Sequence, residues 1–336
     1  MRCLLPILCC AGLSAASVID ATAYRTVDDP DPALRSAARS MPVVLATPRG
    51  GDELYRGLRR LAERDGERYG FRQTRRPSAR WLERGGGIAL VQRGSSRDPQ
   101  EHLAESTERI AAIGADAPLR ALAMTLAADS ISDGARPEYR TIRVERQRAL
   151  LELHVGSSQL QGMDQHQISS IGPNGIPLNY PIQTPRLNLR QLDTTVLVPA
   201  GSGGDASYRV VPSGRHPDLA ARAYRGGMRQ LADTWPDTVL VYATVPLETD
   251  DNQQRHRFNQ QIRAAAAADG AALLDLADLL AHEADGSPAT DAHGPVVAGS
   301  WREGRGLNDA GRERLASAWW QLMDDIAADT QSAEDF

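Results

Sequence analysis

The sequence predicts an α/β protein, a three-layer α/β/α sandwich built on a mainly parallel sheet. Short apolar runs lie at 194–198, 238–244 and 272–276, and the first of them is rich in β-branched residues. Long helical patterns at 219–234 and 252–268 alternate with them. Continuous apolar strands that alternate with helices are typical of a parallel sheet covered on both faces. Active sites in such sheets form at the carboxyl ends of the strands.

The other elements are predicted from the spacing of apolar residues and from turn residues. The expected strands are 42–46, 88–92 and 150–155, and the expected helices are 52–69, 99–113, 118–128 and 310–328. Residues 24–140 carry no motif that we recognise. We therefore predict an N-terminal mixed α/β extension of unknown role over 24–140 and a second domain over 141–330. No long flexible linker lies near residue 140, which favours packing between the two.

The composition narrows the classes of function. The formal net charge at pH 7 is −5, which gives no electrostatic case for nucleic acid as a partner. The basic side chains, histidine aside, are all arginine, because the sequence contains no lysine. This excludes Schiff-base chemistry on a lysine and a phosphate-binding P-loop lysine.

Residues 1–23 have the pattern of an export signal. Arg2 supplies a minimal charged start, residues 3–13 form a short apolar run, and small residues follow, so we expect cleavage after Ala16 or Ala23. The run is too short for a comfortable membrane span, so no stable span is expected after cleavage. All three cysteines lie in this segment, so the mature chain would have no disulfide. The expected location is periplasmic or secreted.

The strand at 150–155 runs into a Gly-Ser-Ser turn and then into helix-compatible sequence. A serine at such a helix start lies beside free backbone N–H groups that can stabilise an oxyanion. Ser158 is therefore the preferred candidate nucleophile, and Ser157 is the second choice. A simple helix cap is the competing interpretation of the same serines.

Gly156-Ser157-Ser158 with Gly162 resembles the first block of the SGNH, or GDSL-like, hydrolase superfamily, whose fold is flavodoxin-like. The resemblance implies that Ser158 is the nucleophile and that the amides of Ser158 and Gly172, in Ile171-Gly-Pro-Asn-Gly, form the oxyanion hole. Residues 200–205 stand where that family has Gly-x-Asn-Asp, but they contain no asparagine. The first block also lacks its aspartate.

The closing segment, Glu303-Gly-Arg-Gly-Leu-Asn-Asp-Ala-Gly, resembles the last block of the same family, Asp-x-x-His followed by Leu-Asn and a glycine-led helix. Gly306 occupies the histidine position and Glu303 the aspartate position. A serine nucleophile needs a general base within hydrogen-bond reach, and glycine cannot serve.

A displaced base could come from His293, which precedes the closing block. Asp291 or Glu303 would then orient its imidazole. The competing interpretation is an exposed loop histidine. We expect His102, His216 and His256 to be solvated. No two histidines have the spacing of a metal-binding helix motif, so neither a metal nor another cofactor is expected.

Three hypotheses remain open. The protein could be an exported serine esterase acting on an acylated carbohydrate or another small-molecule or glycan ester. It could instead be a catalytically degenerate member of the same fold that binds a glycan or an envelope partner. In the third, residues 24–140 carry the function and the rest supports them.

Overall fold

The structure of the protein is a computed structural model that describes most of the chain. The described residues are 17–24, 31–48, 53–75, 77–84, 86–93, 99–131, 135–146, 149–153, 165–171, 177–183, 194–197, 204–212, 215–248, 252–292, 294–304 and 306–334. The chain divides into two compact units, of which unit 1 comprises Met1–Ser132 with Pro217–Phe336 and unit 2 comprises Asp133–His216. Unit 2 is therefore an insertion in the sequence of unit 1, a division that differs from the expected boundary at residue 140.

Unit 1 contains a seven-stranded sheet in which every strand pair is parallel. Its strands are β1 (Val18–Ile19), β2 (Pro42–Pro48), β3 (Gln73–Thr74), β4 (Gly87–Arg93), β5 (Ala121–Met124), β12 (Val239–Ala243) and β13 (Ala272–Leu274). Their order across the sheet is β1-β13-β12-β5-β2-β4-β3. After β2, the chain forms β3 and β4 on one side of β2. It then crosses to the other side of β2 and forms β5, so the direction in which strands are added reverses at β2.

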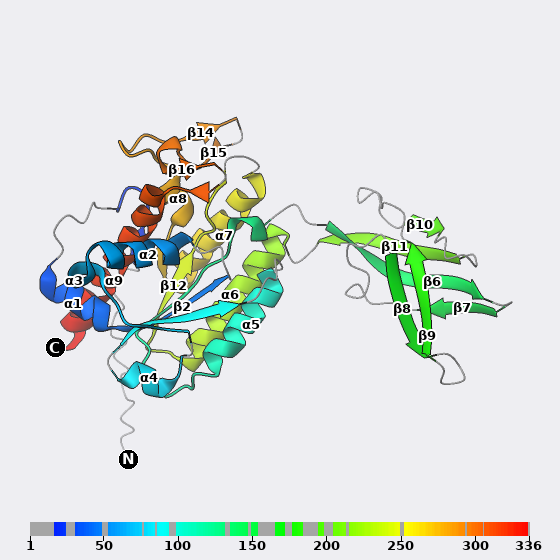
Figure 1. Cartoon of the computed structure of the whole chain (residues 1–336), viewed down its shortest axis with the longest axis horizontal. Helices are drawn as coiled ribbons and strands as arrows, with labels where there is room; N and C mark the ends of the chain where they lie inside the picture. The colour runs from blue at the N-terminus through cyan, green and yellow to red at the C-terminus, as the bar shows by residue number, and fades with distance from the viewer. Residues whose placement is uncertain are drawn as a thin grey trace, which may run out of the picture. The chain divides into compact units, whose positions relative to one another are not determined.

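Helices cover both faces of this sheet (Figure 1). The helices of unit 1 are α1 (Pro32–Ser40), α2 (Glu53–Arg64), α3 (Gly66–Tyr69), α4 (Ala79–Glu83), α5 (Pro99–Ala111), α6 (Pro217–Thr234), α7 (Gln253–Asp269), α8 (Leu276–Leu280) and α9 (Asp309–Glu334). Side chains alternate along β2, so Val43 and Leu45 pack in the core cluster that includes α2 and α9. Val44 and Ala46 pack in the other cluster, with α5, α6 and α7. The predicted α/β/α sandwich is confirmed.

Unit 2 consists of antiparallel strands. A four-stranded sheet has the order β10-β11-β6-β7, and β8 pairs with β9 as a separate hairpin. The strands are β6 (Ala135–Arg146), β7 (Ala149–Leu153), β8 (Gln165–Ile171), β9 (Pro177–Gln183), β10 (Thr194–Leu197) and β11 (Gly204–Pro212). The prediction that the segments at 150–155 and 194–198 belong to the parallel sheet is therefore wrong. Apolar patterning identifies a strand, but it does not identify the strand's partner.

The segment expected to be an extension instead contributes β2, β3, β4 and β5 to the parallel sheet. The strands expected at 42–46 and 88–92 and the helix at 99–113 are confirmed as β2, β4 and α5. The helix expected at 118–128 is wrong, because Ala121–Met124 is the central strand β5. Its alanines, leucine and methionine favour a helix, and burial between two strands overrides that preference. In the part of the chain that the structure describes, no helix is long and apolar enough to cross a membrane.

Candidate binding cleft

A cleft of about 300 Å³ lies beyond the carboxyl ends of the three adjacent strands β2, β5 and β12. Its described walls are the start of α2, residues 127–129 after β5, residues 246–248 after β12, Val297, and the hairpin of β16 (Arg302–Glu303) and β17 (Gly306–Leu307). We call it the strand-end cleft. The reversal of strand order at β2 explains its position, because ligands of open α/β sheets bind at such points.

Arg255 joins two walls of the cleft. Its Nε donates to the carbonyl oxygen of Ala128 at 2.9 Å, and its Nη2 donates to Glu248 Oε2 at 2.8 Å. Asn252 fixes the same loop, since Glu248 donates its backbone N–H to Asn252 Oδ1 and accepts from Asn252 Nδ2, both at 2.9 Å. The Arg255 side chain is only 9% exposed, whereas that of Glu248 is 39% exposed. The carboxylate therefore has a fixed position and a free edge at the cleft.

A second arginine fixes the opposite wall. Arg312, in the first turn of α9, donates from Nε to Glu53 Oε2 at 2.6 Å and from Nη1 to Asp309 Oδ1 at 3.2 Å. Glu53 is the first residue of α2 and lines the cleft. A carboxylate at a helix N-terminus is also favoured by the helix dipole. The ion pair between Arg312 and Glu53 thus joins α9 to α2 at the cleft.

The β16–β17 hairpin forms the rim. Arg302 lies directly opposite Leu307, and Glu303 lies opposite Gly306. Arg302, Gly306 and Leu307 line the cleft, whereas Glu303 is exposed and is not among its lining residues. Apart from its chain neighbours, no heavy atom of the described residues lies within 4 Å of the position that a Cβ on Gly306 would take. That position lies on the same face of the hairpin as Glu303, so the position that the sequence resemblance assigns to the histidine does not project beside Arg302.

The rest of the closing segment has structural roles. Leu307 is buried in the core. Asn308 caps α9, because its Oδ1 accepts from the backbone N–H of Gly311 at 2.8 Å, and its Nδ2 donates to the carbonyl oxygen of Ser300 at 2.8 Å. A Cβ on Gly311 would lie 2.9 Å from both Cβ and the carbonyl oxygen of Trp301. The Leu-Asn-x-x-Gly pattern thus holds the cleft rim against α9.

The described lining residues contain no serine, threonine, cysteine or histidine. Among the predicted site residues, Ser157, Ser158, Gly172 and His293 lie outside the described residues. The structure therefore describes none of the predicted nucleophile, oxyanion hole and base. Asp291 is exposed on the separate β14–β15 hairpin (Thr290–Asp291 and Gly294–Pro295).

Three described histidines lie elsewhere in unit 1. His102 is buried, contrary to the expectation that it is solvated. His256 Nε2 is 2.9 Å from the carbonyl oxygen of Pro295, and burial lowers the pKa of its imidazole. His282 Nδ1 is 2.9 Å from the carbonyl oxygen of Asp278. None of these three lines the strand-end cleft.

Sequence reasoning missed Glu53, Asp129, Glu248 and Arg255. Three of them could have been found from their position, because Glu53, Asp129 and Glu248 follow the buried strands β2, β5 and β12 within a few residues. Of these strands, only β12 was predicted as part of the parallel sheet, since β5 was expected to be a helix and β2 was assigned to an extension.

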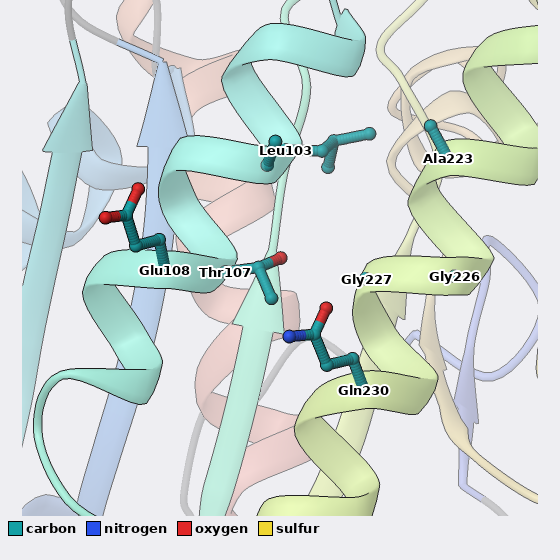
Figure 2. Close-up of a pocket in the computed structure, with 8 residues that line it drawn as sticks. Leu103, Thr107, Glu108, Ala223, Gly226, Gly227 and Gln230 are labelled. Atoms are coloured by element: carbon teal, nitrogen blue, oxygen red, sulfur yellow. The ribbon is translucent and has the colours of Figure 1, made fainter.

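A second hollow, of about 380 Å³, lies between α5 and α6 (Figure 2). Thr107 on α5 and Gly227 on α6 are neighbours there, and a Cβ on Gly227 would lie 2.9 Å from Thr107 Oγ1. The Thr107 hydroxyl is buried and has no hydrogen-bond partner in the described structure. Gly227 therefore permits the two helices to approach closely, which accounts for a glycine inside α6 despite its cost to helix stability.

Comparisons with known proteins add structural similarity without a match in sequence. Neither a family model nor a curated protein matches the chain. The fold is similar to that of a candidate acylhydrolase from Bacteroides fragilis NCTC 9343, with 8% identity and a TM-score of 0.41 over 90% of this chain and 99% of that chain. It is also similar to a candidate GDSL-like lipase from Parabacteroides merdae ATCC 43184, with 9% identity and a TM-score of 0.39 over 85% and 96% of the respective chains.

Proposed function

We propose that this protein is an exported binding protein that holds a short saccharide in the strand-end cleft and breaks no bond in it. The observation that carries the proposal is the cleft lining. Carboxylates and an arginine stand beside apolar side chains there, and Gly306 occupies the sequence position at which the resemblance expects the histidine base. A serine hydrolase of the expected kind uses a serine and a histidine, and the described lining contains neither.

The mixture of groups suits a saccharide. Glu248 has a carboxylate edge beyond its bond to Arg255, and this edge can accept hydrogen bonds from hydroxyl groups. Leu247, Val297 and Leu307 supply apolar contacts at the same cleft, and the C–H faces of a sugar ring can pack on them. A cleft of about 300 Å³ is small for a ligand site, so we expect one or two sugar units inside it.

Walls that are fixed before the ligand arrives favour binding. The Arg255 and Arg312 contacts hold Glu248 and Glu53 in place without a ligand. Less conformational entropy is then lost when a sugar binds, and that loss opposes association.

The test is a titration of the mature protein by calorimetry with neutral and acidic mono- and trisaccharides. We expect saturable binding of at least one sugar, weakened about tenfold by Glu248→Gln, which corresponds to about 1.4 kcal/mol. Glu83→Gln, on the exposed part of α4, is the matched control and should leave the affinity unchanged. If no sugar binds, the proposal is wrong.

The esterase alternative is tested on the same samples with a fluorophosphonate probe. We expect no labelling of the wild type. Labelling that Ser158→Ala abolishes would reveal an activated serine, and it would replace the binding proposal with the hydrolase hypothesis.

A further inference from the structure

The charges of the strand-end cleft are almost all compensated within the protein. Glu53 is paired with Arg312, and Glu248 with Arg255. Asp129, which also lines the cleft, has an interaction of its own. The remaining charged lining residue is Arg302, whose side chain has no hydrogen-bond or ion-pair partner in the part of the chain that the structure describes.

The hairpin directs this uncompensated charge to the cleft. Residues that face each other across an antiparallel pair project from the same face of the ladder. Arg302 faces Leu307, and both line the cleft. The aliphatic part of the Arg302 side chain therefore lies beside a buried leucine. Glu303, the nearest carboxylate in sequence, is paired with Gly306 and projects from the other face.

Gly306 lies next to this arginine on the rim. It precedes Leu307 on β17 and lines the cleft, and a glycine adds no side chain there. The rim beside Arg302 is therefore formed by backbone at this position.

We infer that Arg302 forms a subsite for a carboxylate of the ligand at the rim of the cleft, so that the bound saccharide contains a uronic acid unit. This inference rests on the proposed function and specifies its ligand. The planar guanidinium can donate two parallel hydrogen bonds to a carboxylate, a geometry that neutral hydroxyls do not reproduce. Arg302 is thus a specificity-determining residue.

The experiment compares trigalacturonate with the neutral galactose trisaccharide of the same linkage, titrated by calorimetry. We expect the wild type to prefer the acidic trimer about tenfold or more. Arg302→Ala should weaken binding of the acidic trimer at least tenfold more than binding of the neutral trimer and so remove that preference, while Arg302→Lys should retain part of it. Arg80→Ala, an exposed arginine on α4, is the matched control. Added salt should weaken acidic binding in the wild type more than in Arg302→Ala, because exposed charges are screened.

The outcomes separate this inference from the proposed function. Equal binding of both trimers by the wild type, or equal weakening of both by Arg302→Ala, would overturn the carboxylate subsite while the binding function stands. If neither trimer nor any other sugar of the panel binds, the proposed function itself fails.

Discussion

Arg255 and Ala128 connect two loops that follow different strands of the parallel sheet. The guanidinium Nε lies 2.9 Å from the Ala128 carbonyl oxygen and donates to it. The same guanidinium pairs with Glu248, so one side chain from α7 fixes the loop after β5 and the loop after β12, which form two walls of the strand-end cleft. The cleft is therefore part of the folded framework of unit 1.

Arg255→Ala should destabilise the protein by about 1–3 kcal/mol, because it leaves the Ala128 carbonyl and the Glu248 carboxylate without their donor. Urea unfolding measures this loss. Arg257→Ala is the matched control, since its pair with Asp218 is exposed and should contribute less than about 1 kcal/mol. Equal losses of unfolding free energy for the two variants would show that the Arg255 contacts do not stabilise the cleft walls.

Gly306 and Gly311 should respond in opposite ways to a side chain. Gly306→His should change the free energy of unfolding by no more than about 0.5 kcal/mol, because its Cβ would meet no heavy atom of the described residues within 4 Å apart from its chain neighbours. Gly311→Ala should cost about 1–3 kcal/mol, because its Cβ would lie 2.9 Å from Trp301. Helix propensity alone predicts a gain for Gly311→Ala, so a more stable variant would contradict the packing described for this position.

Asp269 should make the protein sensitive to acid. Hydrogen bonds from Arg225, Arg229 and Tyr242 hold the pKa of its carboxyl below the ordinary value, with the Arg225 bond the largest cause. A pKa lowered by folding stabilises the protein above the unfolded-state value, and this contribution is lost as the pH falls below about 4 towards the folded-state pKa.

Asp269→Asn should therefore cost about 1–3 kcal/mol at pH 7 and flatten the fall in stability below about pH 4. Unfolding by urea at several pH values measures both effects. Asp237→Asn, which removes an exposed carboxylate with no ion pair in the described structure, is the control and should retain the wild-type pH profile. If Asp269→Asn kept the wild-type pH profile, the acid sensitivity would not come from Asp269.

We propose that the predicted export signal is cleaved after Ala16. Val18 and Ile19 form β1, which pairs with Leu273 and Leu274, and Ile19 is 2% exposed. Cleavage after Ala23 would remove this strand. Loss of the buried Ile19 side chain alone would lower the free energy of unfolding by about 1.5–3 kcal/mol. N-terminal sequencing of the exported protein should give Ser17. A mature chain that starts at Tyr24 would contradict this prediction.

The sequence was sufficient to predict the layers of unit 1 from local patterns. The buried runs that became β2, β4, β12 and β13 alternate with amphipathic helices, and this pattern alone indicates a covered parallel sheet. The four residues of β5 could not be identified in this way. Their strand state depends on hydrogen bonds to β2 and β12, which are distant in sequence.

The cleft was harder to predict than the fold. Glu53 and Glu248 are ordinary acidic residues in sequence, and only the adjacency of β2, β5 and β12 brings them to one cavity. Gly306 was found through the closing segment, because Asn308 and Gly311 keep the local signals of a cap and of a close contact. The insertion of unit 2 separates β5 from α6 in sequence, so the continuity of unit 1 was hidden.

The measurement that tests the central claim most directly is a calorimetric titration of the wild type and of Ala127→Trp with the tightest-binding trisaccharide. Ala127 lines the cleft and is half-buried, so an indole at this position would reduce the cleft volume, and a circular dichroism melting curve checks that the variant remains folded. We predict saturable binding by the wild type and none by the folded variant. Equal binding by both proteins would place the ligand elsewhere and contradict the assignment of the strand-end cleft.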